Sequence, residues 1–178
     1  MRLDRLLGEL EVLELRGDPA GTEIAAITHD SRAVTPGALF CCVSGGRVDG
    51  HDLATDAVAD GAVALLCERA VPVAVPQAIV ASTRVAMAPA AATFFGHPSH
   101  HLSVAGVTGT NGKTTTTHFL AAALRADDRS CEVIGTLTGP RTTPEAIELQ
   151  ARLADLVERG VSDAAIEVSS HALAQHRV

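Results

Sequence analysis

The 178-residue sequence is poor in aromatic side chains, with four Phe and neither Tyr nor Trp. A buried aromatic ring removes far more apolar surface from water than Ala or Val, so a core with few rings must rely on close packing of small side chains. Hydrophobic residues still make up 47% and charged residues 20% of the chain, as in ordinary globular proteins. General disorder is therefore excluded, and we expect small-residue contacts between helices and sheet.

Basic clusters and long apolar runs are also lacking. The formal net charge is −7 and no cluster of Lys and Arg occurs, which disfavours nucleic acid as a partner because binding a phosphate backbone requires a basic surface. No apolar run reaches the roughly 18 residues that span a bilayer, and the first ten residues carry acids within their apolar pattern. Membrane insertion and a secretory signal are thus not expected, and the predicted location is cytoplasmic.

The cysteines do not have the spacing of a metal site or a disulfide framework. There are four, none in a CxxC pattern and two of them adjacent: Cys41, Cys42, Cys67 and Cys131. Their neighbours are apolar, so we interpret them as reduced, buried thiols.

Apolar segments alternate with turn residues in a pattern typical of an α/β fold in two parts. The first part predicts helices at 3–10, 51–60 and 84–95, and strands at 24–28, 39–43, 62–67 and 78–81. A polar linker follows at 97–101, and the second part predicts strands at 103–107, 131–137 and 164–168 and helices at 113–126 and 144–159. We expect a small α/β domain at 1–97 and the first part of a doubly wound parallel-sheet domain at 98–178.

A glycine-rich turn joins the predicted strand 103–107 to the predicted helix 113–126. Its sequence, TGTNGKTT at 108–115, suits a triphosphate, because glycines let backbone N–H groups approach phosphate oxygens and the helix start attracts anions. Val107 occupies a position where the general phosphate-loop pattern has Gly, so this is a variant loop. We predict that ATP binds here, with Mg²⁺ near the Thr114 hydroxyl. The expected ATP-binding residues are Gly109, Thr110, Asn111, Gly112, Lys113, Thr114 and Thr115.

This loop resembles that of the Mur ligases and their folylpolyglutamate synthetase relatives, which activate a carboxylate with ATP as an acyl phosphate and join it to an amine. The rest of the chain is similar to the members that add the third amino acid of the peptidoglycan stem peptide to UDP-N-acetylmuramoyl-L-alanyl-D-glutamate. The resemblance covers residues 3–178 and implies a UDP-binding domain followed by an incomplete ATPase-like domain. The amino acid expected is meso-diaminopimelate, the more widespread choice, rather than L-lysine.

The resemblance also implies contacts with the UDP-N-acetylmuramoyl-dipeptide. Segments 28–32 and 45–51 would contribute His29, Ser31, Gly46, Arg47 and Val48. Segment 142–144 and the last residues would contribute Thr142, Thr143, Ser169, Gln175 and Arg177. Local explanations stay open for some of these positions: 30–32 can simply cap a turn, and Thr143 followed by Pro144 is a typical helix start.

Glu167 is the predicted metal ligand, together with Thr114. A carboxylate at the carboxyl end of a buried strand, beside a phosphate loop, is well placed to hold Mg²⁺, and the resemblance points to the same residue. Lys113 and Glu167 are the predicted catalytic residues, which would neutralise charge during phosphoryl transfer. Two interpretations of His171 stay open: it orients Glu167 or the phosphate loop, or it has a structural role.

The chain resembles only part of such an enzyme. Neither the segment whose carbamylated lysine helps to hold a second Mg²⁺ nor the domain that binds the incoming amino acid is recognisable, so we expect no ligation by the chain alone. Amide formation well above background would contradict this. The alternative is a non-catalytic module or remnant that binds UDP-muramoyl peptide and nucleotide, distinguished by binding without ATP turnover. An unrelated phosphate-loop kinase is disfavoured by the glycine spacing.

Overall fold

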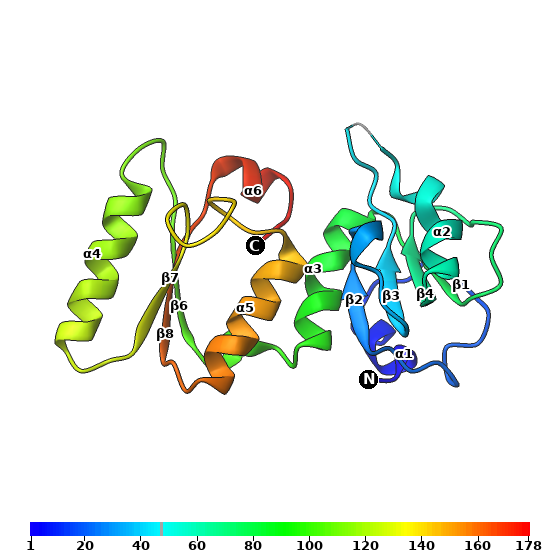
Figure 1. The fold of residues 1–178 in the computed structure, drawn as a ribbon, viewed down its shortest axis with the longest axis horizontal. Coiled ribbons are helices and arrows are strands. Elements are labelled where there is room, and N and C mark those ends of the chain that lie inside the picture. Colours follow the sequence, from blue (N-terminus) through cyan, green and yellow to red (C-terminus); the bar gives the residue numbers. More distant parts are fainter. Residues whose placement is uncertain (47) are drawn as a thin grey trace. The chain divides into compact units, whose positions relative to one another are not determined.

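The computed structural model describes residues 1–46 and 48–178 and divides the chain into two compact units, Met1–Phe94 and Phe95–Val178 (Figure 1). Each unit is built on its own β-sheet. The division falls three residues before the boundary expected after residue 97. Every helix in the described part of the chain is too short or too polar to cross a bilayer.

The first unit contains a five-stranded sheet in the order β1-β5-β4-β3-β2. The strands are β1 (Glu14–Arg16), β2 (Ala26–Thr28), β3 (Ala38–Cys41), β4 (Ala62–Cys67) and β5 (Gln77–Ile79). Strands β2 to β5 run parallel, and the unpredicted β1 pairs antiparallel with β5 at one edge. The carboxyl ends of β2 and β3 are therefore neighbours, and the segments 29–31 and 42–46 leave the sheet at the same end of these strands.

The helices of this unit are α1 (Leu3–Leu7), α2 (Ala54–Ala59) and α3 (Thr83–Phe94), with 3₁₀ turns η1 (Ser31–Ala33) and η2 (Gly50–Leu53). The helix predicted at 51–60 is thus split into η2 and α2. The cause is Asp49, whose carboxylate accepts a hydrogen bond from the His51 backbone N–H and caps the 3₁₀ turn.

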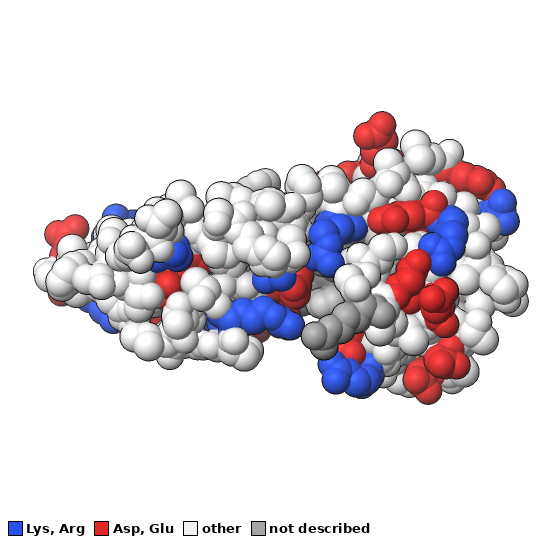
Figure 2. Space-filling model, turned by 90° about the horizontal axis from the view of Figure 1, so that it is seen from above, with Lys and Arg blue, Asp and Glu red and all other residues white. Residues whose placement is uncertain are grey.

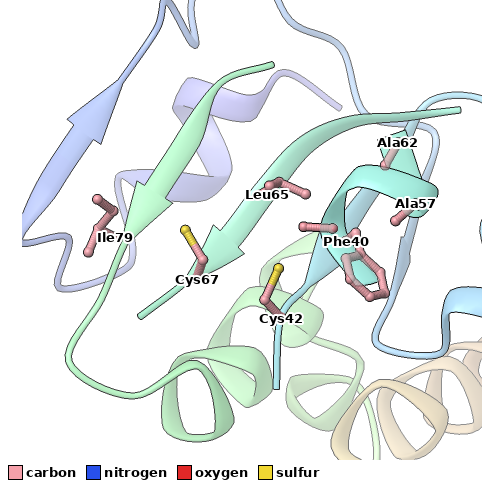
Figure 3. Packing of buried hydrophobic residues seen from close by; sticks show 8 residues of the cluster. Phe40, Cys42, Ala57, Ala62, Leu65, Cys67 and Ile79 are labelled. Carbon is pink, nitrogen blue, oxygen red and sulfur yellow. The ribbon is translucent and has the colours of Figure 1, made fainter. Parts of the chain in front are cut away.

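Small side chains fill the core of the first unit, as the composition predicted. One cluster contains a single aromatic ring among Ala, Leu, Ile and Cys side chains (Figure 3). Its members are Phe40, Cys42, Ala54, Ala57, Ala62, Leu65, Cys67 and Ile79. The thiols are buried and free, and burial raises the pKa of Cys42 to about 12 and that of Cys67 to about 11.

The second unit contains a three-stranded parallel sheet in the order β6-β8-β7. The strands are β6 (Ser103–Val107), β7 (Cys131–Ile134) and β8 (Asp163–Glu167), and the helices are α4 (Lys113–Ala126), α5 (Ala146–Glu158), α6 (Ser170–Ala174) and the 3₁₀ turn η3 (Pro98–His100). Helices α4 and α5 cover opposite faces of the sheet (Figure 1). Successive side chains of the central strand β8 point to opposite faces of the sheet. Ala165 therefore belongs to a buried cluster with Ala121 of α4, and Ile166 belongs to one with Leu149 of α5.

Two predicted boundaries in the second unit are wrong. Helix α5 begins at Ala146, and its N-cap is Glu145, which forms a capping box with Glu148, so Thr143 is not the helix cap. The Thr143 hydroxyl instead donates to the backbone oxygen of Glu167, 2.8 Å away. Strand β7 ends at Ile134 rather than at 137, because the next residues form a turn toward β8.

Candidate functional site

The three strands of the second unit end around a single pocket. The phosphate loop follows β6, a turn containing Thr136 follows β7, and Glu167 ends β8, because the carboxyl ends of parallel strands meet at one edge of a sheet. The pocket has a volume of about 340 Å³ and is lined by Thr110, Asn111, Gly112, Lys113, Thr114, Thr115, Thr136, Thr142 and Glu167. The structure therefore brings together the predicted phosphate loop and the predicted metal ligand.

The phosphate loop has the conformation that its glycines predict. Gly109 and Gly112 have φ values of 149° and 78°, which side chains other than Gly rarely adopt, and Gly112 is the N-cap residue of the 14-residue helix α4. The Lys113 ammonium donates to the Gly109 carbonyl oxygen at 2.7 Å. A helix start and an ammonium group held by a carbonyl oxygen together form a site for an anion.

Arginines elsewhere on the surface are mostly paired with acids. On the face drawn in Figure 2, Lys and Arg lie among Asp and Glu, and ion pairs join Arg32 to Asp30 and Arg69 to Asp49. The hydrogen bonds of Lys113 go to carbonyl oxygens, which leave its positive charge available to a ligand.

Glu167 lies at the back of the pocket and is only 1% exposed. Its carboxylate accepts hydrogen bonds from the Thr114 hydroxyl at 2.8 Å, the Thr136 hydroxyl at 3.1 Å and the Thr136 backbone N–H at 3.0 Å. All three donors are neutral. A carboxylate and a hydroxyl oxygen this close are ligands suited to Mg²⁺. The described residues contain no cluster of three or more His, Cys, Asp or Glu, so such an ion would complete its shell with oxygens of water or of a bound phosphate group.

Two residues behind the carboxylate were not predicted. A Cβ atom on Gly135 would lie 2.2 Å from the Glu167 Oε1 atom, so the carboxylate fits only because this residue is Gly. Thr136 follows it and provides two of the three hydrogen bonds to Glu167. A Gly-Thr pair directly after the strand residues 131–134 was the available signal. His171, by contrast, is exposed on α6, and the hydrogen bonds that orient Glu167 come from Thr114 and Thr136.

Three predicted substrate residues of the second unit, Thr142, Thr143 and Ser169, lie in the loops next to Glu167. Thr142 lines the pocket, and its hydroxyl lies 3.0 Å from that of Thr136. Thr143 is buried and, besides its bond to Glu167, accepts a hydrogen bond from the Ser169 N–H at 3.0 Å. Ser169 in turn caps α6. Thr143 and Ser169 therefore join the loop before α5 to the turn after β8.

Arg177 and Gln175 are bound to the protein itself in this structure. The Arg177 guanidinium forms a 2.8 Å ion pair with Glu145, and these side chains are only 13% and 10% exposed. It also donates to the Gln175 side-chain oxygen at 2.5 Å and lies 3.4 Å from the Thr143 carbonyl oxygen. A ligand that binds Arg177 through its guanidinium must therefore compete with Glu145.

In the first unit, His29 and Ser31 follow β2 and are half-buried. Asp30 between them caps η1 by accepting a hydrogen bond from the Arg32 N–H at 3.0 Å, so the turn-capping interpretation is correct for this residue. The Arg32 guanidinium also binds the Asp30 carboxylate, and these hydrogen bonds lower the pKa of Asp30 to about 2. The cap fixes the backbone that carries Ser31.

In the segment after β3, Ser44 and Gly45 pair with Asp49 and Val48. The Gly45 N–H donates to the Val48 carbonyl oxygen at 3.0 Å, and Val48 is 55% exposed. A Cβ at Gly45 would lie 2.9 Å from the same oxygen, whereas one at Gly46 meets no described atom within 4 Å. The fold therefore requires Gly at 45 but not at 46. Arg47, also predicted to bind substrate, lies outside the described residues.

Asp49 and His51 anchor the base of this segment. The His51 backbone and ring nitrogens approach the Asp49 carboxylate at 3.0 and 2.6 Å, and these contacts hold the pKa of Asp49 well below its usual value. His51 is 2% exposed, and its Nε2 atom accepts a hydrogen bond from the Glu68 N–H at 2.9 Å. His51 thus ties the residues after Val48 to Glu68, directly after β4. This is the carboxyl end of the parallel strands, where Ser31 also lies.

Models of known families match segments of both units. Residues 107–178 match the family model described as Mur ligase middle domain, and residues 23–101 match that described as Mur ligase family, catalytic domain. The chain belongs to the Mur ligase family. Both the phosphate loop with Glu167 and the two loops of the first unit lie almost wholly within the segments that match Mur ligases.

Similar curated Mur ligases share one name, UDP-N-acetylmuramoyl-L-alanyl-D-glutamate--2,6-diaminopimelate ligase. Those of Geobacillus thermodenitrificans and Listeria monocytogenes serovar 1/2a are 46% and 42% identical over 100% of this chain. The chain spans 38% of the length of each.

Solved Mur ligase structures resemble the fold. A structure of UDP-N-acetylmuramoyl-L-alanyl-D-glutamate--2,6-diaminopimelate ligase matches with a TM-score of 0.81 and 26% identity, over 99% of this chain and 37% of that one. The MurF ligase of Thermotoga maritima in complex with ADP matches with a TM-score of 0.59 and 26% identity, over 84% of this chain and 32% of that one.

Proposed function

We propose that this chain forms the UDP-substrate-binding and ATP-binding parts of a MurE-type ligase, which joins diaminopimelate to UDP-N-acetylmuramoyl-L-alanyl-D-glutamate in the cytoplasm. The observation that carries the proposal is the convergence of the phosphate loop, Lys113 and buried Glu167 on one pocket. The name of the 46% identical Geobacillus relative supplies the substrate class.

ATP would bind with its phosphates against the loop and the start of α4. The Lys113 ammonium would exchange the Gly109 carbonyl oxygen for phosphate oxygens and offset the charge that develops as the γ-phosphoryl group moves to the D-Glu carboxylate. The incoming amine would then attack the acyl carbon of the acyl phosphate, the C–O bond to phosphate would break, and the amide would form with release of inorganic phosphate and a proton. Mg²⁺, held by Thr114 and Glu167, would supply further neutralisation of the phosphate charge.

The UDP part of the substrate would lie over the carboxyl ends of β2 and β3. Ser31 can donate a hydrogen bond there, and glycine at position 46, which the fold does not require, permits a diphosphate to approach the backbone closely. His29, Arg47 and Val48 would complete this contact. The muramoyl peptide would meet Thr142, Thr143, Ser169, Gln175 and Arg177, and an acidic group on it could replace Glu145 as the partner of Arg177.

The test is a hybrid ligase. Residues 1–178 replace the matching part of the Geobacillus thermodenitrificans relative, and ADP release is measured with UDP-N-acetylmuramoyl-L-alanyl-D-glutamate in the presence and absence of diaminopimelate. We expect diaminopimelate-dependent ADP release that Lys113→Ala abolishes, whereas Thr116→Val, an exposed position on α4, leaves it unchanged. A hybrid that binds both substrates as the relative does, but releases no ADP, would refute ligation and favour the non-catalytic binding module.

A further inference from the structure

The turn that follows β7 contacts the predicted metal ligand more extensively than the phosphate loop does. We infer that Gly135 and Thr136 position the Glu167 carboxylate for Mg²⁺ without binding the ion themselves, an inference that rests on the proposed function. Thr136 is a positioning residue in this role, because the hydrogen bonds that assign it run to the Glu167 carboxylate.

Both oxygens of the Glu167 carboxylate are fixed by Thr136. Its backbone N–H binds Oε1 at 3.0 Å, and its hydroxyl binds Oε2 at 3.1 Å. The remaining bond, from Thr114, comes from a hydroxyl that itself belongs to the proposed ligand set of the ion. Thr136 is therefore the partner that can keep the carboxylate in place while Thr114 turns its oxygen toward a cation.

The hydroxyl protons also connect Thr136 to the loop before α5, residues 142–144, which we call the substrate loop. A threonine hydroxyl has one proton, and that of Thr136 goes to Glu167. The 3.0 Å contact between the Thr136 and Thr142 hydroxyls must then use the proton of Thr142. Thr142 consequently presents lone pairs to the pocket and accepts, rather than donates, a hydrogen bond from a ligand. One chain of hydroxyls thus joins the substrate loop to the metal carboxylate.

Gly135 lies against the Glu167 carboxylate and leaves room for it by having no side chain. The Glu167 Oε1 atom occupies the space where a Cβ of residue 135 would be, with the hypothetical contact at only 2.2 Å. The turn is closed by a 2.8 Å hydrogen bond from the Gly135 N–H to the Thr138 hydroxyl. Because the φ value of Gly135 is not positive, alanine there strains no backbone torsion, and its effect is the displacement of Glu167.

The experiment measures ATP binding by the 178-residue chain over a range of Mg²⁺ concentrations. Thr136→Val removes the hydroxyl at nearly constant shape, and Thr136→Ser keeps it. We expect Thr136→Val to raise the Mg²⁺ concentration required for half-maximal enhancement of binding by roughly 10- to 100-fold, the usual effect of losing a residue that orients a metal ligand. Thr136→Ser should restore the wild-type requirement, Thr116→Val should leave it unchanged, and Mg²⁺-free ATP binding should be the same in all four proteins.

A second pair of variants tests the steric part. Gly135→Ala should raise the Mg²⁺ requirement as Thr136→Val does, whereas Gly21→Ala, where a Cβ meets no described atom within 4 Å, should not. An unchanged Mg²⁺ requirement in Thr136→Val and Gly135→Ala would overturn the inference, as would an equal loss of Mg²⁺-free binding, the sign of a merely structural role. Failure of the wild-type chain to bind ATP at any Mg²⁺ concentration would overturn the proposed function itself.

Discussion

Replacing Asp49 by alanine should loosen the first unit and leave the second unaffected. The Asp49 carboxylate caps η2 and also binds the ring of His51, which is buried. His51 Nε2 accepts the Glu68 N–H, so in the neutral ring the proton is on Nδ1 and is donated to Asp49. Asp49→Ala removes the cap and leaves this Nδ1–H group buried without its acceptor.

The magnitude follows from these two losses. A lost N-cap costs about 0.5–2 kcal/mol, and a buried donor without a partner costs about 1–3 kcal/mol. The exposed contact with Arg69 adds less than about 1 kcal/mol. We expect Asp49→Ala to lower the free energy of opening of the first unit by about 2–4 kcal/mol. Asp52→Ala, an exposed neighbour in the same 3₁₀ turn, should change it by less than about 0.5 kcal/mol.

The buried cysteines provide the assay. Cys41, Cys42 and Cys67 lie in the first unit and Cys131 lies in the second, and burial raises the pKa of all four thiols, so alkylation requires opening of the surrounding structure. Mass spectrometry should show alkylation of the first three accelerated by roughly 30- to 1,000-fold in Asp49→Ala, at 1.4 kcal/mol per tenfold change. Equal rates in Asp49→Ala and Asp52→Ala, or equal acceleration at Cys131, would show that Asp49 does not specifically stabilise the first unit.

Two further predictions concern the first unit. Gly61→Ala should destabilise the first unit by about 1–3 kcal/mol in the same alkylation assay, because the φ value of Gly61 is 113° and a Cβ would lie 2.8 Å from the Pro36 Cα atom. The control Gly21→Ala should have little effect on the alkylation rates, and equal effects of the two substitutions would contradict the prediction. Because the folded pKa of Asp30, about 2, lies below its unfolded value of about 4, Asp30 stabilises the unit above about pH 4, and this is lost as the pH falls through about 2. Carboxyl-carbon NMR should give that midpoint, and an unchanged midpoint in Arg32→Gln would refute the assigned cause.

The phosphate-loop region was predictable because its signals are local. The strand at 103–107 and the helix at 113–126 are confirmed at both ends, since an apolar run leads into glycines and Gly112 marks the helix start. The sequence also placed Glu167 correctly at the end of a buried strand, from the rule that ligands gather at carboxyl ends.

The surroundings of Glu167 were not predictable in the same way. Glycine is depleted in strands, but Thr136 and Leu137 after it resume the β-branched and apolar pattern, so the predicted strand runs past Gly135 and misses the turn. What ends the strand is a tertiary contact with Glu167, 31 residues away from Thr136. The same holds for Thr143, because several residues at 142–145 could cap a helix, and its bond to the backbone of β8 leaves the cap to Glu145.

We propose that one chain binds two ligands at separate sites, and separate isothermal titrations of ATP with Mg²⁺ and of UDP-N-acetylmuramoyl-L-alanyl-D-glutamate measure both affinities. The wild-type chain should bind both, and Lys113→Ala should lose ATP binding while its affinity for the UDP ligand stays nearly unchanged. A wild-type chain that binds neither ligand, or an equal loss of both in Lys113→Ala, would contradict the account.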